Sequence, residues 1–204
     1  MGAYSPAHLI TDDLEAQIIK TIIEPTIAGM AAENCPFTGV LFAGIIVVNS
    51  KPILLEHNVR FGDPECQTLM MRFDGNLPEV LMAAAMGELA KVKKHVHWSP
   101  EPALCVVMAA KGYPEAYSKN TIIKGLDEAE KVTNVVIFHA GTEKGINGEI
   151  LSAGGRVLGV CAKAKTLREA KEKAYNAIDK IIWSEGFYRH DIAWRALAAK
   201  KKNV

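Results

Sequence analysis

The chain has 204 residues, of which 49% are hydrophobic and 23% are charged, and its formal net charge is +1. This length and apolar content allow one large domain or two small ones, each with a real core. The near-zero charge gives no electrostatic reason to expect nucleic acid as a partner. Apolar runs such as 40–48 and 80–86 are too short to cross a bilayer, so no membrane partner is expected. We therefore expect a soluble, cytoplasmic protein.

The cysteines give no sign of a metal or redox centre. The four of them are widely spaced and form no C-x-x-C pair, which predicts reduced thiols and neither a zinc site nor a redox motif. They are Cys35, Cys66, Cys105 and Cys161.

The first predicted elements are a helix and a pair of strands. Thr11 precedes acidic residues and an amphipathic pattern, as expected for a helix N-cap. Pro25 should kink or end this helix, although the helical pattern resumes after it. Residues 37–48 are mainly β-branched, aromatic or small, which predicts a strand buried on both faces. A turn at 49–52 should then lead into a partner strand over 53–60.

Helices are predicted to follow a bend at residues 62–64. Residues 66–72 suit a short helix or turn, and residues 78–92 predict a clearer helix with Pro78 at its first position. A proline-bearing connector at 98–102 then suggests a boundary. We predict one domain over residues 1–98 and a second over residues 103–204.

The second half of the chain predicts a small sheet. Residues 103–110, 135–139 and 156–162 look like strands separated by polar, glycine-containing turns. The glycine-rich stretch 141–148 lacks the Gly-Lys-Ser/Thr ending of a phosphate loop, which favours a mobile hairpin.

One long helix should complete this half. The sequence from Thr166 to Glu169 is typical of a capping box, and the apolar stripe that follows predicts a helix that ends near Gly186. Residues 200–202 are predicted to be a solvated or frayed tail.

Three ligand-type side chains alternate near the end of the strand predicted over 53–60. In an extended segment Glu56, Asn58 and Arg60 would share one face. A carboxylate oxygen and an amide oxygen two residues apart can hold a divalent cation, and a guanidinium can bind a carboxylate or a phosphate. The apolar stretch 53–55 favours this interpretation, because a carboxylate that enters a buried region needs a cation. The spacing alone fits equally well an edge strand whose polar face meets water.

Two more candidates each have a structural alternative. The turn at 61–64 would aim Asp63 towards the same cleft, but Asp63 is at least as well placed to cap the next helix. Arg156 follows two glycines that let the backbone approach a ligand closely, and a bulge or plain turn explains them about as well. The glycine-bearing start of the chain, residues 1–6, by itself indicates a loop.

Several strings together resemble the C-terminal half of the phosphoribosylamine–glycine ligase family, of the ATP-grasp class. They run in order over nearly the whole chain: MGAYSPA, FTGVLFAGI, LLEHNVRFGDPECQ, VVMAAKGYPE, VVIFHAGT, GGRVLGV and GFYRHDIAWRAL. The E-x-N-x-R-F-G-D-P-E string is specific to this ligase. The resemblance implies an α+β fold. Residues 1–98 would be the C-terminal part of an ATP-grasp domain, an antiparallel sheet with helices, and a small β-rich domain with one long helix would follow.

The resemblance also implies an activity and roles for the candidates. In such ATP-dependent carbon–nitrogen ligases, ATP phosphorylates the carboxylate of glycine, and 5-phosphoribosylamine attacks the glycyl phosphate to give glycinamide ribonucleotide in purine biosynthesis. Glu56 and Asn58 would hold Mg²⁺ or Mn²⁺ on the ATP phosphates. Arg60 would be catalytic, through electrostatic stabilisation. The residues expected at the substrate or nucleotide site are Gly2, Ala3, Tyr4, Ser5, Asp63 and Arg156.

The match begins inside a family motif, so the N-terminal domain and the nucleotide lid would come from elsewhere. We expect activity to require the missing N-terminal half as a partner. His57 replaces a more usual aromatic residue, and its side chain should point away from the metal. Two alternatives stay open: a non-catalytic fragment or interaction module that retains the fold, and another ATP-grasp carboxylate–amine ligase.

Overall fold

A computed structural model describes residues 1–199 as an α+β fold in which every pair of strands is antiparallel. The chain forms two compact units. Unit 1 contains residues 1–6, 63–72 and 99–199, and unit 2 contains residues 7–62 and 73–98. No helix within residues 1–199 is both long and apolar enough to cross a membrane. The tail predicted at 200–202 lies outside the described residues.

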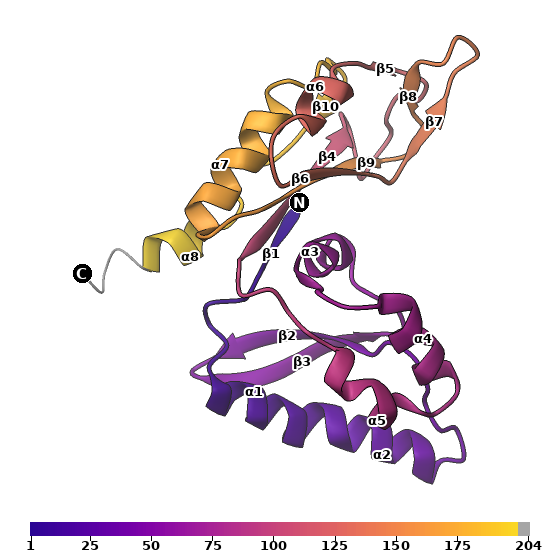
Figure 1. The fold of residues 1–204 in the computed structure, drawn as a ribbon, viewed down its shortest axis with the longest axis vertical. Coiled ribbons are helices and arrows are strands. Elements are labelled where there is room, and N and C mark those ends of the chain that lie inside the picture. The colour runs from indigo at the N-terminus through magenta and orange to yellow at the C-terminus, as the bar shows by residue number, and fades with distance from the viewer. Residues whose placement is uncertain (200–204) are drawn as a thin grey trace. The chain divides into compact units, whose positions relative to one another are not determined.

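The main sheet of unit 1 combines strands that lie close together in the sequence with strands that lie far apart in it (Figure 1). It contains β1 (Gly2–Ser5), β4 (Ala103–Ala110), β9 (Arg156–Lys163) and β6 (Val135–His139), in the order β1-β4-β9-β6. A short strand, β10 (Gly186–Phe187), pairs with β4 beyond the end of β1. The predictions of strands at 103–110 and 135–139 are confirmed to the residue.

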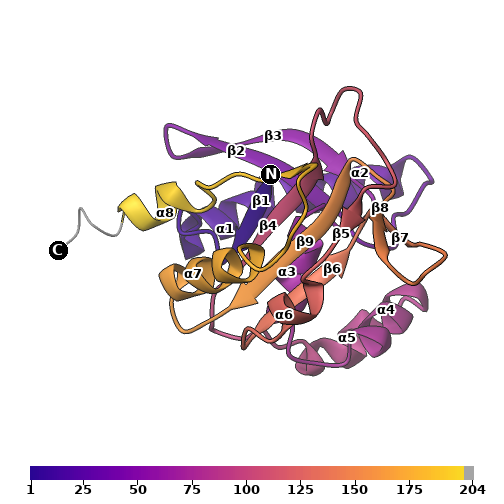
Figure 2. The same ribbon diagram turned by 90° about the horizontal axis from the view of Figure 1, so that it is seen from above.

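Helices cover both faces of this sheet, as Figures 1 and 2 show: α7 (Leu167–Ile178) lies on one side and α3 (Glu65–Arg72) on the other. Every residue of β4 is buried as a result. Small side chains on α7, among them Ala170 and Ala174, let that helix approach the sheet closely. This sandwich is the hydrophobic core of unit 1.

The helix α7 begins as predicted but ends early. The Thr166 hydroxyl accepts from the Glu169 amide, and the Glu169 carboxylate accepts from the Thr166 amide, so the capping box is confirmed. The prediction that the helix reaches Gly186 is wrong, because it ends at Ile178. Beyond it the backbone of Ile182 pairs with that of Lys124, and this pairing takes the chain out of the helix.

The remaining strands and helices of unit 1 are short. A second sheet has the order β5-β8-β7, with β5 (Ile122–Ile123), β7 (Thr142–Lys144) and β8 (Ile150–Ser152). The remaining helices of unit 1 are α6 (Leu126–Glu130) and α8 (Trp194–Ala199). The hairpin predicted over 141–148 is formed by β7 and β8. Its mobility stays a prediction.

The predicted domains and the spatial units divide the chain differently. Residues 1–6 and 63–72 group in space with residues 99–199, because β1 completes the edge of the β4 sheet and α3 covers one face of it. The division into domains of 1–98 and 103–204 stays a prediction.

Unit 2 begins with one long helical run. It consists of α1 (Asp12–Ile18), the π-helical turn η1 (Ile19–Ile23) and α2 (Glu24–Ala32), and the Thr11 hydroxyl caps it by accepting from the Leu14 amide at 3.3 Å. Pro25 does not end the helix, contrary to one alternative of the prediction. The wider π-turn comes directly before it and lets the helix continue past a residue that has no N–H.

A hairpin of β2 (Phe42–Val48) and β3 (Lys51–Asn58) follows. Its two-residue turn uses Asn49 and Ser50 at positive φ values of 49° and 61°, which suits the twist of the strands. The prediction of a strand over 37–48 buried on both faces is wrong: β2 starts at Phe42, and its residues are half-buried or exposed. The partner strand ends at Asn58, short of the predicted end at residue 60.

The predicted single helix over 78–92 is two helices, α4 (Leu77–Ala85) and α5 (Leu89–Val92), followed by the 3₁₀ turn η2 (Lys93–His95). Asn76 caps α4 by accepting from the Glu79 amide at 3.3 Å. The break comes at Gly87, whose φ of 71° is left-handed and ends an α-helix.

Candidate metal and nucleotide site

The side chains of Glu56 and Asn58 lie together on one face of β3. The Asn58 amide nitrogen donates to Glu56 Oε1 at 3.2 Å, and the Glu56 side chain is exposed. This is the geometry that the two-residue period of a strand predicts. Rotation of the Asn58 amide would present its oxygen beside the carboxylate, which gives two hard oxygen ligands for a divalent cation.

The neighbouring strand leaves room for this pair. Gly44 of β2 is opposite Glu56, and a Cβ at Gly44 would lie 2.9 Å from Glu56 Cγ. A glycine is therefore needed if Glu56 is to keep its present rotamer. On the other side of β3, His57 Nε2 is 3.2 Å from the hydroxyl of Thr26 on α2. As expected, His57 points away from the Glu56–Asn58 pair.

Metal binding here would depend on more than protein ligands. No group of three or more His, Cys, Asp or Glu side chains suited to a metal occurs within residues 1–199. Mg²⁺ is commonly held by one or two protein oxygens together with phosphates and water, so the Glu56–Asn58 pair fits a cation that arrives with a nucleotide.

Arg60 lies beyond the end of β3, so strand alternation does not set its direction. Its Nη1 donates to the carbonyl oxygen of Phe61 at 2.8 Å, and the side chain is exposed. The expected single face of three groups is thus reduced to Glu56 and Asn58. The sequence pattern missed this because it carried the strand two residues too far.

Asp63 and Arg156 bind each other within unit 1. Arg156 Nη1 donates to the backbone oxygen of Asp63 at 2.9 Å and lies 3.2 Å from its carboxylate, and Arg156 Nε donates to the Tyr113 hydroxyl at 3.2 Å. The hydrogen bond with Tyr113, followed by the nearby charge of Asp63, raises the pKa of Arg156. The Asp63 carboxylate also accepts from the side-chain nitrogen of Gln67, and these two contacts are not those of a helix cap.

The four candidates at the start of the chain form strand β1 and not the loop that their sequence indicates. The backbone pairs with β4, so successive side chains point to opposite faces of the sheet. Ser5 accepts a hydrogen bond at 2.6 Å from Arg72 of α3, whereas Tyr4 packs against the core cluster that includes α7. Ala3 shares a face with Ser5. All four residues cannot line one cavity.

Gly2 and Tyr4 line a cavity of about 210 Å³ with the segment that precedes and begins α8. In it, Arg189 makes a two-point ion pair with Asp191, at 2.8 and 2.6 Å, which lowers the pKa of Asp191 to about 2. Arg195 lies 5.1 Å from the ring centre of Trp194. None of these three charged residues was predicted from the sequence, although two arginines and an aspartate in the string GFYRHDIAWRAL were a signal.

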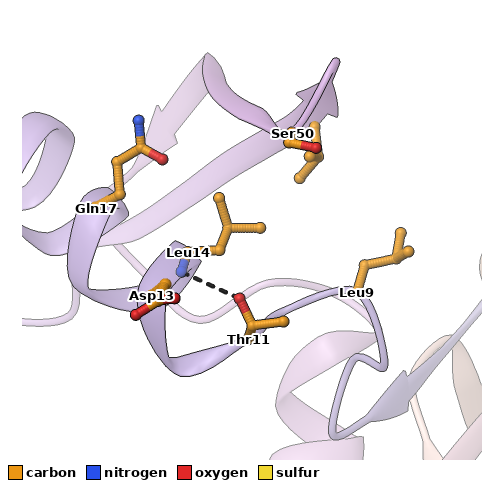
Figure 3. A pocket seen from close by; sticks show the side chains of 7 residues that line it. Leu9, Thr11, Asp13, Leu14, Gln17 and Ser50 are labelled. Atoms are coloured by element: carbon orange, nitrogen blue, oxygen red, sulfur yellow. Dashed lines mark hydrogen bonds between the residues drawn. The ribbon is translucent and has the colours of Figure 1, made fainter.

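A larger cavity, of about 370 Å³, lies in unit 2 (Figure 3). None of the predicted site residues lines it. The Thr11 hydroxyl that borders it is engaged in capping α1, as the dashed line in Figure 3 marks. Its lining residues are Leu9, Thr11, Asp13, Leu14, Gln17, Val47 and Ser50.

Two models of one family match the chain. Residues 1–66 match the phosphoribosylglycinamide synthetase ATP-grasp (A) domain, and residues 103–195 match the phosphoribosylglycinamide synthetase C domain. The chain belongs to the phosphoribosylamine–glycine ligase family. The predicted resemblance is confirmed.

Two members of the phosphoribosylamine–glycine ligase family show how much of the protein is covered. The chain is 53% identical over 204 residues to the chloroplastic phosphoribosylamine–glycine ligase of Arabidopsis thaliana, covering 98% of this chain and 38% of that protein. It is 53% identical over 199 residues to the ligase of Rhizobium meliloti, covering 97% of this chain and 46% of that one. The chain therefore spans less than half the length of these relatives.

Solved structures agree with the predicted ATP-grasp fold. The phosphoribosylamine–glycine ligase of Thermotoga maritima superposes with a TM-score of 0.77 at 29% identity, covering 94% of this chain and 46% of that one. A biotin carboxylase from Campylobacter jejuni, solved as a β-γ-ATP complex, gives a TM-score of 0.65 at 16% identity, covering 94% of this chain and 41% of that one. The second likeness shows the fold alone.

Proposed function

We propose that this chain contributes the metal-binding strand and the C domain of an ATP-dependent ligase that joins glycine to 5-phosphoribosylamine. The observation that carries the proposal is the pairing of Glu56 and Asn58 on one face of β3 in a member of this family. Because the chain spans less than half of its relatives, the complete reaction is proposed for the ligase with its remaining segments.

The proposed reaction has two steps. A carboxylate oxygen of glycine attacks the γ-phosphorus of ATP, and the bond to the leaving oxygen of ADP breaks, which gives glycyl phosphate. The amine nitrogen of 5-phosphoribosylamine then attacks the acyl carbon, an amide forms, and inorganic phosphate and a proton leave. The product is glycinamide ribonucleotide, which places the chain in purine biosynthesis.

Three residues of unit 2 have roles in the first step. Glu56 and Asn58 would hold Mg²⁺ or Mn²⁺, and such a cation neutralises charge on the ATP phosphates. Arg60 would supply a guanidinium, whose planar fork of N–H donors suits the oxygens of a phosphate. In the proposal it stabilises charge on the transferring phosphoryl group and does not transfer a proton.

The candidates of unit 1 have separate roles in the proposal. Gly2 and Tyr4 line a cavity, which supports their placement at a substrate site. Arg156 is neutralised by Asp63, which supports a role in holding the turn that follows the metal strand. Ala3 and Ser5 face the other side of β1 and would act only on the position of that strand.

The surface of unit 2 supports a partner that completes the fold. Val59 and Leu55 are 74% and 66% exposed, and few apolar residues of unit 2 are buried. A two-stranded sheet such as β2–β3 is marginal without further strands or a covering layer. We propose that the N-terminal half of the ligase provides this cover.

The test is a carboxylate substitution in the ligase completed with its remaining segments. We expect Glu56→Ala to abolish ATP-dependent and glycine-dependent phosphate release, because the metal loses its charged ligand. Glu33→Ala, at an exposed glutamate of the same unit, is the matched control and should retain activity. Full activity of the Glu56 variant would contradict the metal role.

An interaction module that binds no ATP is the second candidate. The observation in its favour is that β3 offers only two protein ligands and that unit 2 exposes large apolar side chains. Titration of Mg-ATP into the isolated chain tests this candidate, since tight metal-dependent binding of ATP excludes it. The names of the relatives argue against the alternative of another ATP-grasp carboxylate–amine ligase. Activity assays with other carboxylic acids test that alternative.

The cellular location is a separate proposal. We propose a cytoplasmic location, as expected from the sequence. The Arabidopsis thaliana relative is described as chloroplastic. Microscopy of the tagged full-length protein would distinguish the two compartments.

A further inference from the structure

The chain passes between the two units at four places, after residues 6, 62, 72 and 98. Three of these crossings have their unit 1 end at, or next to, residues that one side chain holds together. Arg72 Nη1 donates to the Ser5 hydroxyl at 2.6 Å, and its Nε and Nη2 donate to the carbonyl oxygen of Ser99 at 3.1 and 2.9 Å. Residues 5, 72 and 99 are thus fastened at one point.

The backbone reinforces the same point. The Ser99 amide donates to the carbonyl oxygen of Arg72 at 2.7 Å. Farther along the two segments, within unit 2, Phe73 and Trp98 form an antiparallel bridge, and the Asp74 amide donates to the His97 carbonyl oxygen at 2.9 Å. Two of the four crossings are therefore a paired ribbon and not separate loose linkers.

The chemistry of Arg72 suits a structural clamp. Burial lowers its pKa, since a half-buried site disfavours the charged form. No carboxylate lies within ion-pair distance of it in the described part of the chain, and oxygens of Ser5 and Ser99 solvate the guanidinium instead. A lysine could not replace it, because only the planar guanidinium presents several donors in a fixed fork.

We propose that Arg72 is a positioning residue that fixes three of the four chain crossings to unit 1 and so limits the movement of unit 2. The proposal rests on the proposed function for its importance, because that function draws its metal ligands from unit 2 and substrate-binding candidates from unit 1. A loosened crossing would widen the range of positions that unit 2 can take while each unit stays folded.

Hydrogen exchange tests the local part of this proposal in the chain as it stands. In Arg72→Met, the amides of Ser99 and Ser5 should exchange about tenfold faster, since a charged donor is lost from each anchored segment. Arg72→Lys should give a smaller increase, and Arg168→Met, at an exposed arginine of α7, should give none. Protection of the β4 amides reports whether unit 1 remains folded. If the methionine variant unfolds, the lysine variant becomes the test of the proposal.

The distance between the units tests the positioning role itself. Nitroxide labels at Ala28→Cys on α2 and Glu172→Cys on α7, with Cys35 and Cys66 replaced by serine, report that distance by pulsed electron resonance. The distribution should broaden in Arg72→Met and not in the Arg168 control. An unchanged distribution overturns the proposal, even if exchange at Ser99 is faster. Neither measurement needs ligase activity. Failure of the positioning proposal is therefore distinguishable from failure of the proposed function.

Discussion

Gly44→Ala perturbs the candidate metal site without touching a metal ligand. The new methyl group would lie 2.9 Å from Glu56 Cγ, 3.6 Å from the Glu56 carbonyl oxygen and 3.7 Å from Oε1. Because the first distance is shorter than any normal carbon contact, the Glu56 side chain must leave its rotamer or lean away from Asn58. The backbone at Gly44 can stay as it is, since its φ is not left-handed.

The size of the effect follows from the cost of that displacement. An off-rotamer side chain costs about 0.5–1.5 kcal/mol, which corresponds to roughly two- to tenfold weaker binding of a cation held by Glu56. The matched control is Gly29→Ala on α2, where a Cβ would meet nothing within 4 Å. That control should leave binding unchanged and stabilise the helix slightly, because alanine is the better helix former.

Binding of Mn-ATP to the completed ligase provides the assay, followed through the loss of the free Mn²⁺ resonance signal. Gly44→Ala should bind more weakly than both the parent and Gly29→Ala, and Glu56→Ala should bind weakest. If Gly44→Ala binds as tightly as the parent while its unfolding temperature is unchanged, Glu56 does not act from the position that it occupies on β3. The geometric argument for the metal site would then be refuted.

Two further predictions concern unit 1 and the thiols. Leu158→Ala, at a side chain with 0% exposure in β9, should destabilise the protein by about 2.7–5.0 kcal/mol. Ile122→Ala, at 50% exposure, should cost far less, and denaturant unfolding compares the two; equal losses would mean that β9 is not the centre of the core. Burial and the nearby Asp63 raise the pKa of Cys66, and burial followed by Cys105 raises that of Cys161. Because a higher pKa leaves less thiolate at pH 8, a thiol reagent should label exposed Cys35 first, Cys66 more slowly and Cys161 only on unfolding. Fast labelling of Cys161 in the folded chain would contradict its burial.

Local signals in the sequence were sufficient for several elements. The capping box at Thr166 depends on residues three apart, and the run at 103–110 is apolar on both faces because it is a central strand. The pairing of Glu56 with Asn58 follows from the two-residue period of a strand. These features need no knowledge of distant contacts.

Other features depend on contacts between distant segments, and the sequence predicted them poorly. Gly2–Ser5 became a strand because β4, about a hundred positions away in the chain, offers it a free edge. Arg156 binds Asp63, which is 93 residues away, and nothing in the sequence indicated this contact; the predicted contact of Arg156 with a ligand stays a prediction. Arg60 was assigned to a shared face because the end of β3 is set by its pairing with β2 and not by local propensity.

The sequence by itself determined the family, the α+β class and the pair of metal-ligand candidates, because motif order and strand periodicity are local properties of the chain. Only the tertiary structure decided which candidates meet. It separated the two faces of β1, joined Asp63 to Arg156, and brought Ser5 and Ser99 to the guanidinium of Arg72. Side-chain partners of this kind are chosen by the packing of α3 and β9 on one sheet, and that packing has no signature in any short stretch of residues.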